Sequence, residues 1–304
     1  MSDIAKKPEI AFIGIGLMGF PMATRLLQAG YPLRAWNRTH EKALPLAEAG
    51  AQVEKTLGKA VKGADIVITM LEAGPVVKDV VKAMLPFLSA GMLVIDMSST
   101  KQSEAVEVSQ MLSEKQVVFM DAPVSGGVVG ASAGTLAIMA GGSQEAFKRA
   151  EPLFKAMGRP TLVGPVGSGQ IAKLCNQLIV GGTVAIVAEA MLLAQAGGAD
   201  PAAMRQAIRG GFAESRILEL HGQRMLDRDF KPGGQIKSQA KDHANIMAAA
   251  ADAGLQIPLT AMVAELFNSL LEDYATADQA AALLAVEKIN KDKGIRLGTA
   301  EDRF

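Results

Sequence analysis

The feature that most constrains the fold is a glycine-rich turn between an apolar run and a helical stretch. The run IAFI is followed by GIGLMG and then by PMATRLLQAG. In this order Gly14 permits a tight turn, Gly16 lets the backbone approach a pyrophosphate, and Gly19 lets the helix pack closely on the strand. Free amides at the helix start favour an anion. The loop, with Leu17 and Met18, predicts a dinucleotide site, although glycine-rich turns also occur without a ligand.

The same alternation of apolar runs and helical stretches continues through the first half of the chain. Strands are predicted at 10–14, 33–36, 66–71, 93–96, 117–123, 136–141 and 161–164. Continuous apolar strands that alternate with helices are typical of a mostly parallel sheet covered on both faces. The first half is therefore predicted to be a Rossmann-type, doubly wound α/β domain.

After Gly169 strand signals vanish and helical spacing takes over. Helices are predicted at 170–196, 201–209, 236–253 and 259–273. Glycine and proline cluster at 164–170, which is typical of a domain boundary. We expect a dinucleotide-binding domain at 1–166 and an all-helical substrate and oligomerisation domain at 167–304. It would begin with a long interdomain helix at 170–196. The polar tail after Asn290 is expected to be loosely held or draped on a partner.

The end of the second predicted strand bears on the choice of dinucleotide. NAD-binding domains usually carry Asp or Glu there, which binds the ribose hydroxyls. This chain has Asn37, Arg38 and Thr39 instead. A carboxylate would repel a 2′-phosphate, whereas an arginine offers it a charged fork. NADP(H) is therefore favoured over NAD(H). The alternative is that Arg38 is a solvated loop charge and Thr39 a helix cap.

Composition excludes several other classes of function. Lys plus Arg and Asp plus Glu number 31 each, so no global charge attracts nucleic acid. One cysteine and three scattered histidines match no metal-ligand spacing, and a disulfide within the chain is impossible. The first residues, MSDIAKKPE, lack the apolar core of a signal peptide. The apolar segment 174–196 contains polar residues and is predicted to be a buried helix, not a membrane span. We expect a cytoplasmic protein.

The segment DAPVSGG follows another predicted strand. Ligands of open α/β sheets bind outside the carboxyl ends of strands. Ser125, Gly126 and Gly127 can present a hydroxyl and consecutive amides to a small carboxylate. A flexible turn is an equally plausible interpretation of these residues alone. Asp121, at the strand end, is expected to be structural.

A lysine lies near the start of the apolar helix, within GSGQIAKLCNQLIVGG. Lys173 and Asn176 are three residues apart and share a helix face. An isolated helical lysine is often just a solvated charge. Directly after a dinucleotide-binding half, however, it could protonate or polarise a carbonyl oxygen while hydride arrives at carbon. Asn176 could hold the same substrate. Cys175, between them, is expected to be a small core residue.

Four motifs in this order, GIGLMGFPMA, DMSS, DAPVSGG and GSGQIAKLCNQ, resemble the β-hydroxyacid dehydrogenase family over about residues 9–290. The resemblance implies that Lys173 is catalytic, and that Ser125, Gly126, Gly127 and Asn176 hold the substrate. It also implies cofactor contacts by Leu71 and Ser99, and a second lysine, Lys241, near cofactor and substrate.

Within that family the second half is similar to the branch of tartronate semialdehyde (2-hydroxy-3-oxopropionate) reductases. The branch implies reversible reduction of this aldehyde to glycerate; 3-hydroxyisobutyrate or another 3-hydroxyacid is the alternative substrate. Two departures from the family pattern stand out. Glu72 replaces the usual proline and places a charge near the mouth of the site. Many members carry Asp in place of the NRT segment and use NAD.

Two further functions are compatible with parts of this pattern. Imine reductases resemble the family but usually lack a lysine at position 173, and non-catalytic nucleotide-sensing relatives have lost it. An intact Lys173 and Asn176 argue for carbonyl chemistry. The apolar second half has more apolar surface than one small lobe can cover, so a homodimer or homotetramer is expected.

Overall fold

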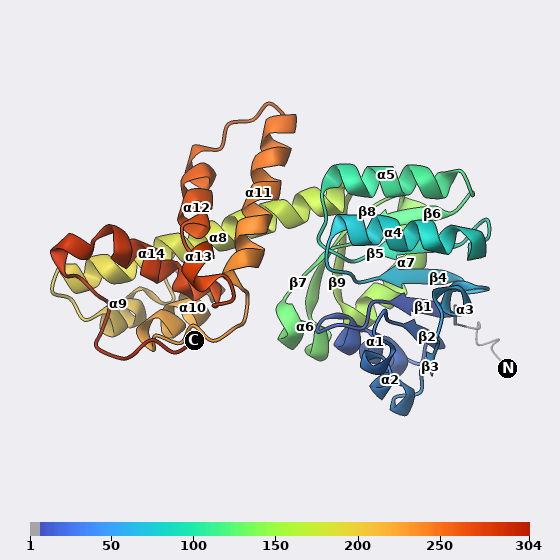
Figure 1. Ribbon diagram of the computed structural model, residues 1–304, viewed down its shortest axis with the longest axis horizontal. Helices are drawn as coiled ribbons and strands as arrows, with labels where there is room; N and C mark the ends of the chain where they lie inside the picture. The colour runs from blue at the N-terminus through green and yellow to red at the C-terminus, as the bar shows by residue number, and fades with distance from the viewer. Residues whose placement is uncertain (1–6) are drawn as a thin grey trace. The chain divides into compact units, whose positions relative to one another are not determined.

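A computed structural model describes residues 7–304 of the protein (Figure 1). The chain divides into two compact units, Met1–Lys173 and Leu174–Phe304. The long helix α8 (Ser168–Ala196) contributes to both.

The N-terminal unit is built on a nine-stranded sheet in the order β3-β2-β1-β4-β5-β6-β8-β7, with β9 pairing to β8. Only the pairs β6–β8 and β7–β8 are antiparallel among the described residues. The strands are β1 (Ile10–Ile13), β2 (Leu33–Trp36), β3 (Gln52–Val53), β4 (Ile66–Thr69), β5 (Leu93–Asp96), β6 (Val118–Asp121), β7 (Val124–Ser125), β8 (Leu136–Gly141) and β9 (Gly158–Gly164).

Helices cover both faces of this sheet. They are α1 (Gly19–Gln28), α2 (Pro45–Glu48), α3 (Leu57–Val61), α4 (Gly74–Met84), α5 (Gln102–Ser113), α6 (Gly127–Ala133) and α7 (Gln144–Met157). Two short 3-10 turns, His40–Lys42 and Leu85–Phe87, complete the unit.

Side chains along β1 point alternately to the two faces of the sheet, and this explains the two layers of helices. Ile10 and Phe12 pack in one core with α1, α2 and α7, whereas Ala11 and Ile13 pack in a second core with α3, α4 and α5. Figure 1 shows α4 and α5 on one side of the sheet and α1 and α2 on the other. Because both faces are buried, the strands have continuous apolar sequences. The predicted Rossmann-type, mostly parallel α/β fold is confirmed.

The predicted strands all exist, and two were missed. Strands β3 and β7 are two residues long and carry no apolar run. A strand this short exists only because its neighbours, β2 and β8, offer a pairing edge. The last strand begins at Gly158, ahead of the predicted 161–164, because its first residues pair with β8.

The second unit is helical. Its elements after α8 are α9 (Pro201–Ile208), α10 (Arg216–Leu226), α11 (Ile236–Asp252), α12 (Pro258–Asn268), α13 (Leu271–Tyr274) and α14 (Ala282–Ile289), with 3-10 turns Gln279–Ala281 and Lys291–Lys293. Val184, Ala188 and Met191 of α8 lie in its core with Phe230 and Phe267. The predictions missed α10 and α14, and placed one helix over α12 and α13.

The tail after Asn290 is held by its own chain, so the prediction of a loosely held tail is wrong. The buried side chain of Arg228 donates to the Leu297 carbonyl at 3.0 Å and pairs with the Asp302 carboxylate. The Phe304 ring stacks on Tyr274 at 5.3 Å between centroids. The sequence of the tail is mostly polar, and the Arg228 side chain that holds Leu297 and Asp302 lies 69 and 74 residues away from them along the chain.

Helix α8 is long and apolar enough to cross a membrane by length and composition alone. One such helix is weak evidence for a span, because core helices of soluble proteins pass the same test. One face of α8 packs in the second core, as described above.

Candidate functional site

The glycine loop connects β1 to α1, and at two of its three positions only glycine fits. Gly14 has φ +102°, and a Cβ there would collide with the Met70 carbonyl. A Cβ on Gly19 would collide with the Gly14 carbonyl. Gly16 is exposed, with nothing within 4 Å of an added Cβ. Two glycines thus close the turn, and the third leaves its backbone open to a ligand.

The loop borders a groove of about 670 Å³ at the carboxyl ends of β1, β2 and β4. Strand β1 pairs with β2 on one side and β4 on the other, so the strand order reverses here. Such a switch point is where doubly wound sheets bind nucleotides. Predicted site residues that line the groove are Gly14, Gly16, Asn37, Arg38, Thr39 and Leu71. Leu17, which is largely exposed, and Met18, which is half-buried, complete the loop outside this lining.

The three residues after β2 have different surroundings. The Asn37 side chain accepts a hydrogen bond from the Ile15 amide at 2.9 Å and donates to the Thr39 carbonyl at 2.8 Å. It thereby fastens the glycine loop to the end of β2. Arg38 and Thr39 are exposed, and Lys42 lines the same groove. Two cations therefore border its β2 side.

The far side of the groove is supported by a buried hydrogen-bond chain. The Leu71 amide donates to Ser98 Oγ at 2.8 Å, and Ser98 Oγ donates to Asp96 Oδ1 at 2.6 Å. Thr69 Oγ1 donates to the same oxygen at 2.8 Å. The predicted cofactor residue Ser99 is only half-buried, and Ser98 is its fully buried neighbour. Nothing in the sequence DMSS distinguishes the two serines. Glu72 is exposed and lines the groove.

The DAPVSGG segment runs from the last residue of β6 through β7 to the start of α6. Ser125 ends β7 and is half-buried; Gly126 and Gly127 are exposed. Both glycines have positive φ, +135° and +62°, which favours glycine at each position. The segment therefore places a half-buried serine beside two exposed glycines at the start of α6.

The start of α8, which carries Lys173, is fastened to the strand ends. Asp121 Oδ1 accepts from the Gly167 amide at 2.7 Å, and Oδ2 accepts from the Gln170 amide at 2.8 Å. The Gln170 side chain accepts from the Thr100 amide and donates to the Ser98 carbonyl, both at 2.9 Å. Lys173 is half-buried and lies one turn beyond Gln170. Asp121 is structural, as expected.

Burial raises the pKa of Asp121 from 3.8 to about 6, and the Asp96 charge adds to the rise. Burial likewise raises the pKa of Asp96. The amide donors at Gly167 and Gln170 oppose the shift at Asp121 but do not cancel it.

Asn176 and Lys241 belong to the second unit. Asn176 Nδ2 donates to Gln177 Oε1 at 2.8 Å, and Gln177 Nε2 donates to Asp242 Oδ2 at 2.8 Å. Asp242 is buried, and its Oδ1 lies 3.6 Å from Lys241 Nζ. A connected set of side chains thus runs from α8 to α11. Gln177 and Asp242 are the members that attach the Lys241 helix to the Asn176 turn.

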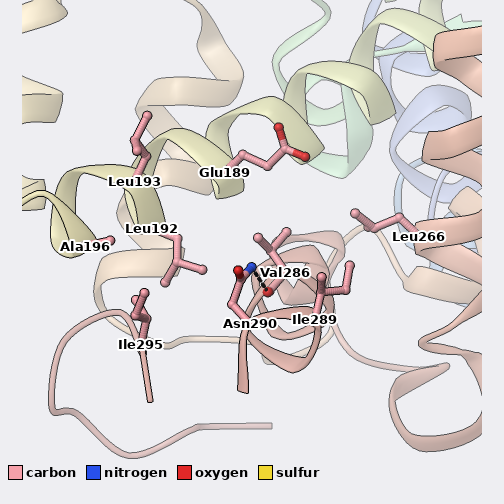
Figure 2. Close-up of a pocket in the computed structure, with 9 residues that line it drawn as sticks. All are labelled: Glu189, Leu192, Leu193, Ala196, Leu266, Val286, Ile289, Asn290 and Ile295. Atoms are coloured by element: carbon pink, nitrogen blue, oxygen red, sulfur yellow. Dashed lines mark hydrogen bonds between the residues drawn. The ribbon is translucent and has the colours of Figure 1, made fainter. Parts of the chain in front are cut away.

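Other parts of the described chain offer no competing chemistry. Cys175 is exposed, so its predicted core position is wrong. Within residues 7–304 no group of three His, Cys, Asp or Glu side chains could hold a metal ion. A hollow of about 320 Å³ lies in the second unit. Figure 2 shows the side chains that line it, among them Leu192, Ile289 and Asn290. Its lining is almost entirely aliphatic, with Glu189 as its one charged side chain.

Comparison with known proteins agrees with this geometry. Residues 9–177 match the family described as the NAD binding domain of 6-phosphogluconate dehydrogenase. Residues 167–286 match the family described as the NAD-binding domain of NADP-dependent 3-hydroxyisobutyrate dehydrogenase. The 2-hydroxy-3-oxopropionate reductase of Escherichia coli is 39% identical over 295 residues, which cover 92% of this chain and 99% of that protein. The chain belongs to the β-hydroxyacid dehydrogenase family.

Other β-hydroxyacid dehydrogenases are nearly as similar. The NAD-dependent L-serine dehydrogenase of Pseudomonas aeruginosa is 36% identical, over 89% of this chain and 95% of that protein. Mycobacterium tuberculosis 3-hydroxyisobutyrate dehydrogenase, solved with L-serine, has a TM-score of 0.85 and 31% identity. That match covers 92% of this chain and 99% of the solved one.

As a β-hydroxyacid dehydrogenase, the protein binds a nicotinamide dinucleotide and oxidises a small hydroxyacid or reduces the corresponding oxo acid. The relatives differ in substrate at similar identity, so identity alone does not select one.

Proposed function

We propose that the protein is an NADPH-dependent reductase that converts 2-hydroxy-3-oxopropionate to glycerate, reversibly, with Lys173 as the acid/base group. The observation that carries the proposal is the placement of Lys173. It is half-buried one turn into α8, and that turn is fastened to the ends of β5 and β6. The end of β5 is connected to the groove through Ser98, which accepts from the Leu71 amide, and the end of β6 leads into the Ser125 loop. The 39% identical E. coli reductase supports the choice of substrate.

A nicotinamide dinucleotide held in the groove would supply the hydride for this reduction. The Lys173 ammonium donates a proton to the aldehyde oxygen as negative charge develops there, and solvent then reprotonates the amine. Ser125 and the Gly126 and Gly127 amides bind the substrate carboxylate, and Asn176 holds it in register. In the reverse direction the neutral lysine accepts the hydroxyl proton.

Discrimination for NADPH would come from the β2 side of the groove. Arg38 and Thr39 are exposed there, Lys42 lines the same wall, and the carboxylate typical of NAD-binding domains is missing. The Arg38 guanidinium would donate two hydrogen bonds to the 2′-phosphate, and the Lys42 ammonium would add a second positive charge. The carboxylate of 2-hydroxy-3-oxopropionate would bind near Ser125.

A substrate panel with both cofactors tests the reaction. NADPH oxidation is followed at 340 nm with 2-hydroxy-3-oxopropionate, and NADP⁺ or NAD⁺ reduction with glycerate, 3-hydroxyisobutyrate and L-serine. We expect the highest kcat/KM for the aldehyde acid. Higher values for L-serine or 3-hydroxyisobutyrate would reassign the substrate. Turnover of imines, with none of these acids turned over, would exclude carbonyl reduction as the reaction.

The Lys173→Ala variant tests the catalytic group. Loss of a general acid lowers kcat by about 10²- to 10⁴-fold. Binding of NADPH, measured by fluorescence titration, should be unchanged. Lys155→Ala, at an exposed lysine paired with Glu151 on α7, is the control and should keep full activity. Turnover near the normal rate without Lys173 would refute the assignment.

Cofactor discrimination is tested with Arg38→Ala, alone and combined with Lys42→Ala. Each lost charge-assisted contact weakens NADPH by about 10- to 100-fold and should leave NADH nearly unaffected. Arg159→Ala removes an exposed arginine outside the groove lining and is the control. An equal loss for both cofactors would contradict 2′-phosphate recognition.

The proposal includes a cytoplasmic homodimer or homotetramer. The oligomer is supported by an apolar stripe on α8. Ile179, Ile186 and Leu193 are spaced by seven residues and are 65%, 64% and 73% exposed. Side chains at this spacing share one face of a helix and form the seam of helix pairs.

A further inference from the structure

A single buried carboxylate caps the helix that carries the proposed catalytic lysine. The residue before α8 is Gly167, which has no side chain with which to cap the helix. In an ordinary capping box, two side chains of the helix itself satisfy the first and fourth amides. Here Asp121, at the end of β6, satisfies both, one with each oxygen, at 2.7 and 2.8 Å. These partners are 46 and 49 residues away in the chain.

The pocket that holds this carboxylate is closed by glycines. A Cβ on Gly141 would lie 2.5 Å from Asp121 Oδ1, and a Cβ on Gly169 would lie 2.8 Å from Oδ2. Both glycines are buried, so larger side chains would displace the carboxylate or the helix start. The site is therefore shaped around the two oxygens and holds the first turn of α8 in one position.

A second attachment fixes the rotation of the same turn. Gln170 binds both the Thr100 amide and the Ser98 carbonyl, and Ser98 also holds the Leu71 amide beside the groove. Lys173 follows Gln170 by three residues, so it moves with that turn. Asp121 lies four residues before Ser125, so one short segment reaches both the substrate loop and the lysine helix.

We propose that Asp121 is a positioning residue: its ionised carboxylate sets the place of Lys173 relative to the groove and the Ser125 loop. The inference rests on the proposed function, because it acts through Lys173. A protonated carboxyl group carries a hydrogen on one oxygen, and that oxygen is then a much weaker acceptor for the amide hydrogen it faces. Protonation therefore loosens the start of α8 and moves the ammonium group away from the substrate oxygen.

The groups that face Asp121 allow a change of activity near pH 6 to be assigned to its carboxyl group. Asp96 on β5 lies directly across the sheet in register with it and opposes its ionisation. β8 presents Gly141, and the first turn of α8 presents Gly167, Gly169 and Gln170. Lys173 lies one turn further along. With a pKa of about 6, Asp121 changes charge just below neutral pH.

The test uses the full chain with NADPH and 2-hydroxy-3-oxopropionate, and compares Asp121→Asn with Gln170→Ala from pH 5 to 8.5. In Asp121→Asn we expect kcat to fall by about 10- to 100-fold, since displacement of a catalytic group by about 1 Å costs this much. KM and the Kd of NADPH should change by less than about 3-fold. The wild-type kcat should fall as pH drops through about 6, and Asp121→Asn should lack this acid limb.

Gln170→Ala should also lower kcat but keep the acid limb, because its carboxylate cap is intact. Ser143→Ala removes the cap of α7, whose Oγ accepts from the Ala146 amide at 3.1 Å, and is the matched control. It should lower stability without changing kcat or the pH profile. Hydrogen exchange of the amides at 167–173 should speed up in Asp121→Asn and not in Ser143→Ala.

Several results would overturn the inference. One is an Asp121→Asn protein with normal kcat; another is an acid limb that persists in that variant. If Asp121→Asn does not fold, a wild-type kcat that stays constant from pH 5 to 8 contradicts the inference equally. Failure of the proposed function itself is distinguishable, because Lys173→Ala would then keep its turnover whatever Asp121 does.

Discussion

At the scale of single residues, Asp121 holds a charge where burial opposes one. Burial raises its pKa to about 6, so at neutral pH the folded protein carries an ionised group that the interior disfavours. Two amide hydrogen bonds compensate only in part. Spacing rules could not reveal this role, because the carboxylate and the helix it caps are separated by more than forty residues. The sequence indicated only a structural aspartate.

The raised pKa predicts a particular dependence of stability on pH. The folded carboxyl binds its proton more tightly than the unfolded one. Its stabilising contribution is therefore complete below pH 4 and is lost as pH rises through about 6. The free energy of unfolding of the wild type, relative to Asp121→Asn, should fall by up to about 3 kcal/mol between pH 4 and 7.5. Urea unfolding followed by the single tryptophan, Trp36, measures it. A pH-independent difference would contradict it.

Arg228 is the opposite case, a buried charge with full compensation. Its side chain is 1% exposed and pairs with Glu287 at 2.8 Å and with Asp302. Burial lowers the pKa of Arg228, but hydrogen bonds to the two carboxylates outweigh that effect and raise it overall. It stays charged at every relevant pH and connects α14 to the tail.

Arg228→Met should therefore destabilise the second unit by about 3–5 kcal/mol, because the Glu287 carboxylate, whose side chain is 12% exposed, loses its buried partner. Asp302 keeps Arg296, 3.2 Å away. The measurement is urea unfolding by circular dichroism. Lys288→Ala, which breaks an exposed pair with Asp273 at 3.8 Å, is the control and should cost no more than about 1 kcal/mol. Equal losses of unfolding free energy in the two variants would mean that the buried ion pairs of Arg228 stabilise the protein no more than an exposed pair does.

At the scale of elements, prediction succeeded where one segment determines its own structure. Strands β1, β4 and β5 are buried on both faces, so their apolar runs marked them directly. Strand β7 was missed because it forms only by pairing with β8. The role of Ser98 was missed because it depends on a hydrogen bond from the distant Leu71 amide. Helix α8 was predicted nearly to its ends, but its glycine pair was left unexplained.

The two glycines of α8 have different surroundings. A Cβ on Gly181 would collide with the His243 ring and the Gln239 amide group of α11. A Cβ on Gly182 would meet nothing within 4 Å. Close approach of α8 and α11 therefore requires only Gly181, and the hydrogen bond from Gln177 to Asp242 depends on that approach.

Alanine at each position separates packing from helix propensity. Gly181→Ala should destabilise the second unit by about 1–3 kcal/mol, because the helices must move apart. Gly182→Ala should stabilise it by up to about 1 kcal/mol, since alanine is the better helix former and the space is open. Thermal unfolding by circular dichroism compares the two. Stabilisation by both substitutions would show that α8 and α11 can accommodate a methyl group at position 181.

At the scale of the whole molecule, the order of four motifs was enough to indicate the family, and the comparisons agree with it. The substrate is a different matter. Relatives that act on 2-hydroxy-3-oxopropionate and on L-serine differ by only a few per cent in identity to this chain. Selectivity depends on a few side chains around a small molecule, and Glu72 at the groove is the departure from the family pattern most in need of measurement.

The exposed stripe on α8 predicts the assembly state. Apolar side chains on one face of a helix lose contact with water when a second copy covers them, which favours association. Ile186→Arg places a charge in the middle of the Ile179–Ile186–Leu193 stripe and should convert the oligomer to a monomer at micromolar concentration. Light scattering after size exclusion gives the mass. Leu44→Arg, at an exposed apolar residue of the N-terminal unit, is the control and should leave the mass unchanged. A wild type that is already monomeric, or an Ile186→Arg protein of unchanged mass, would exclude this face as the contact.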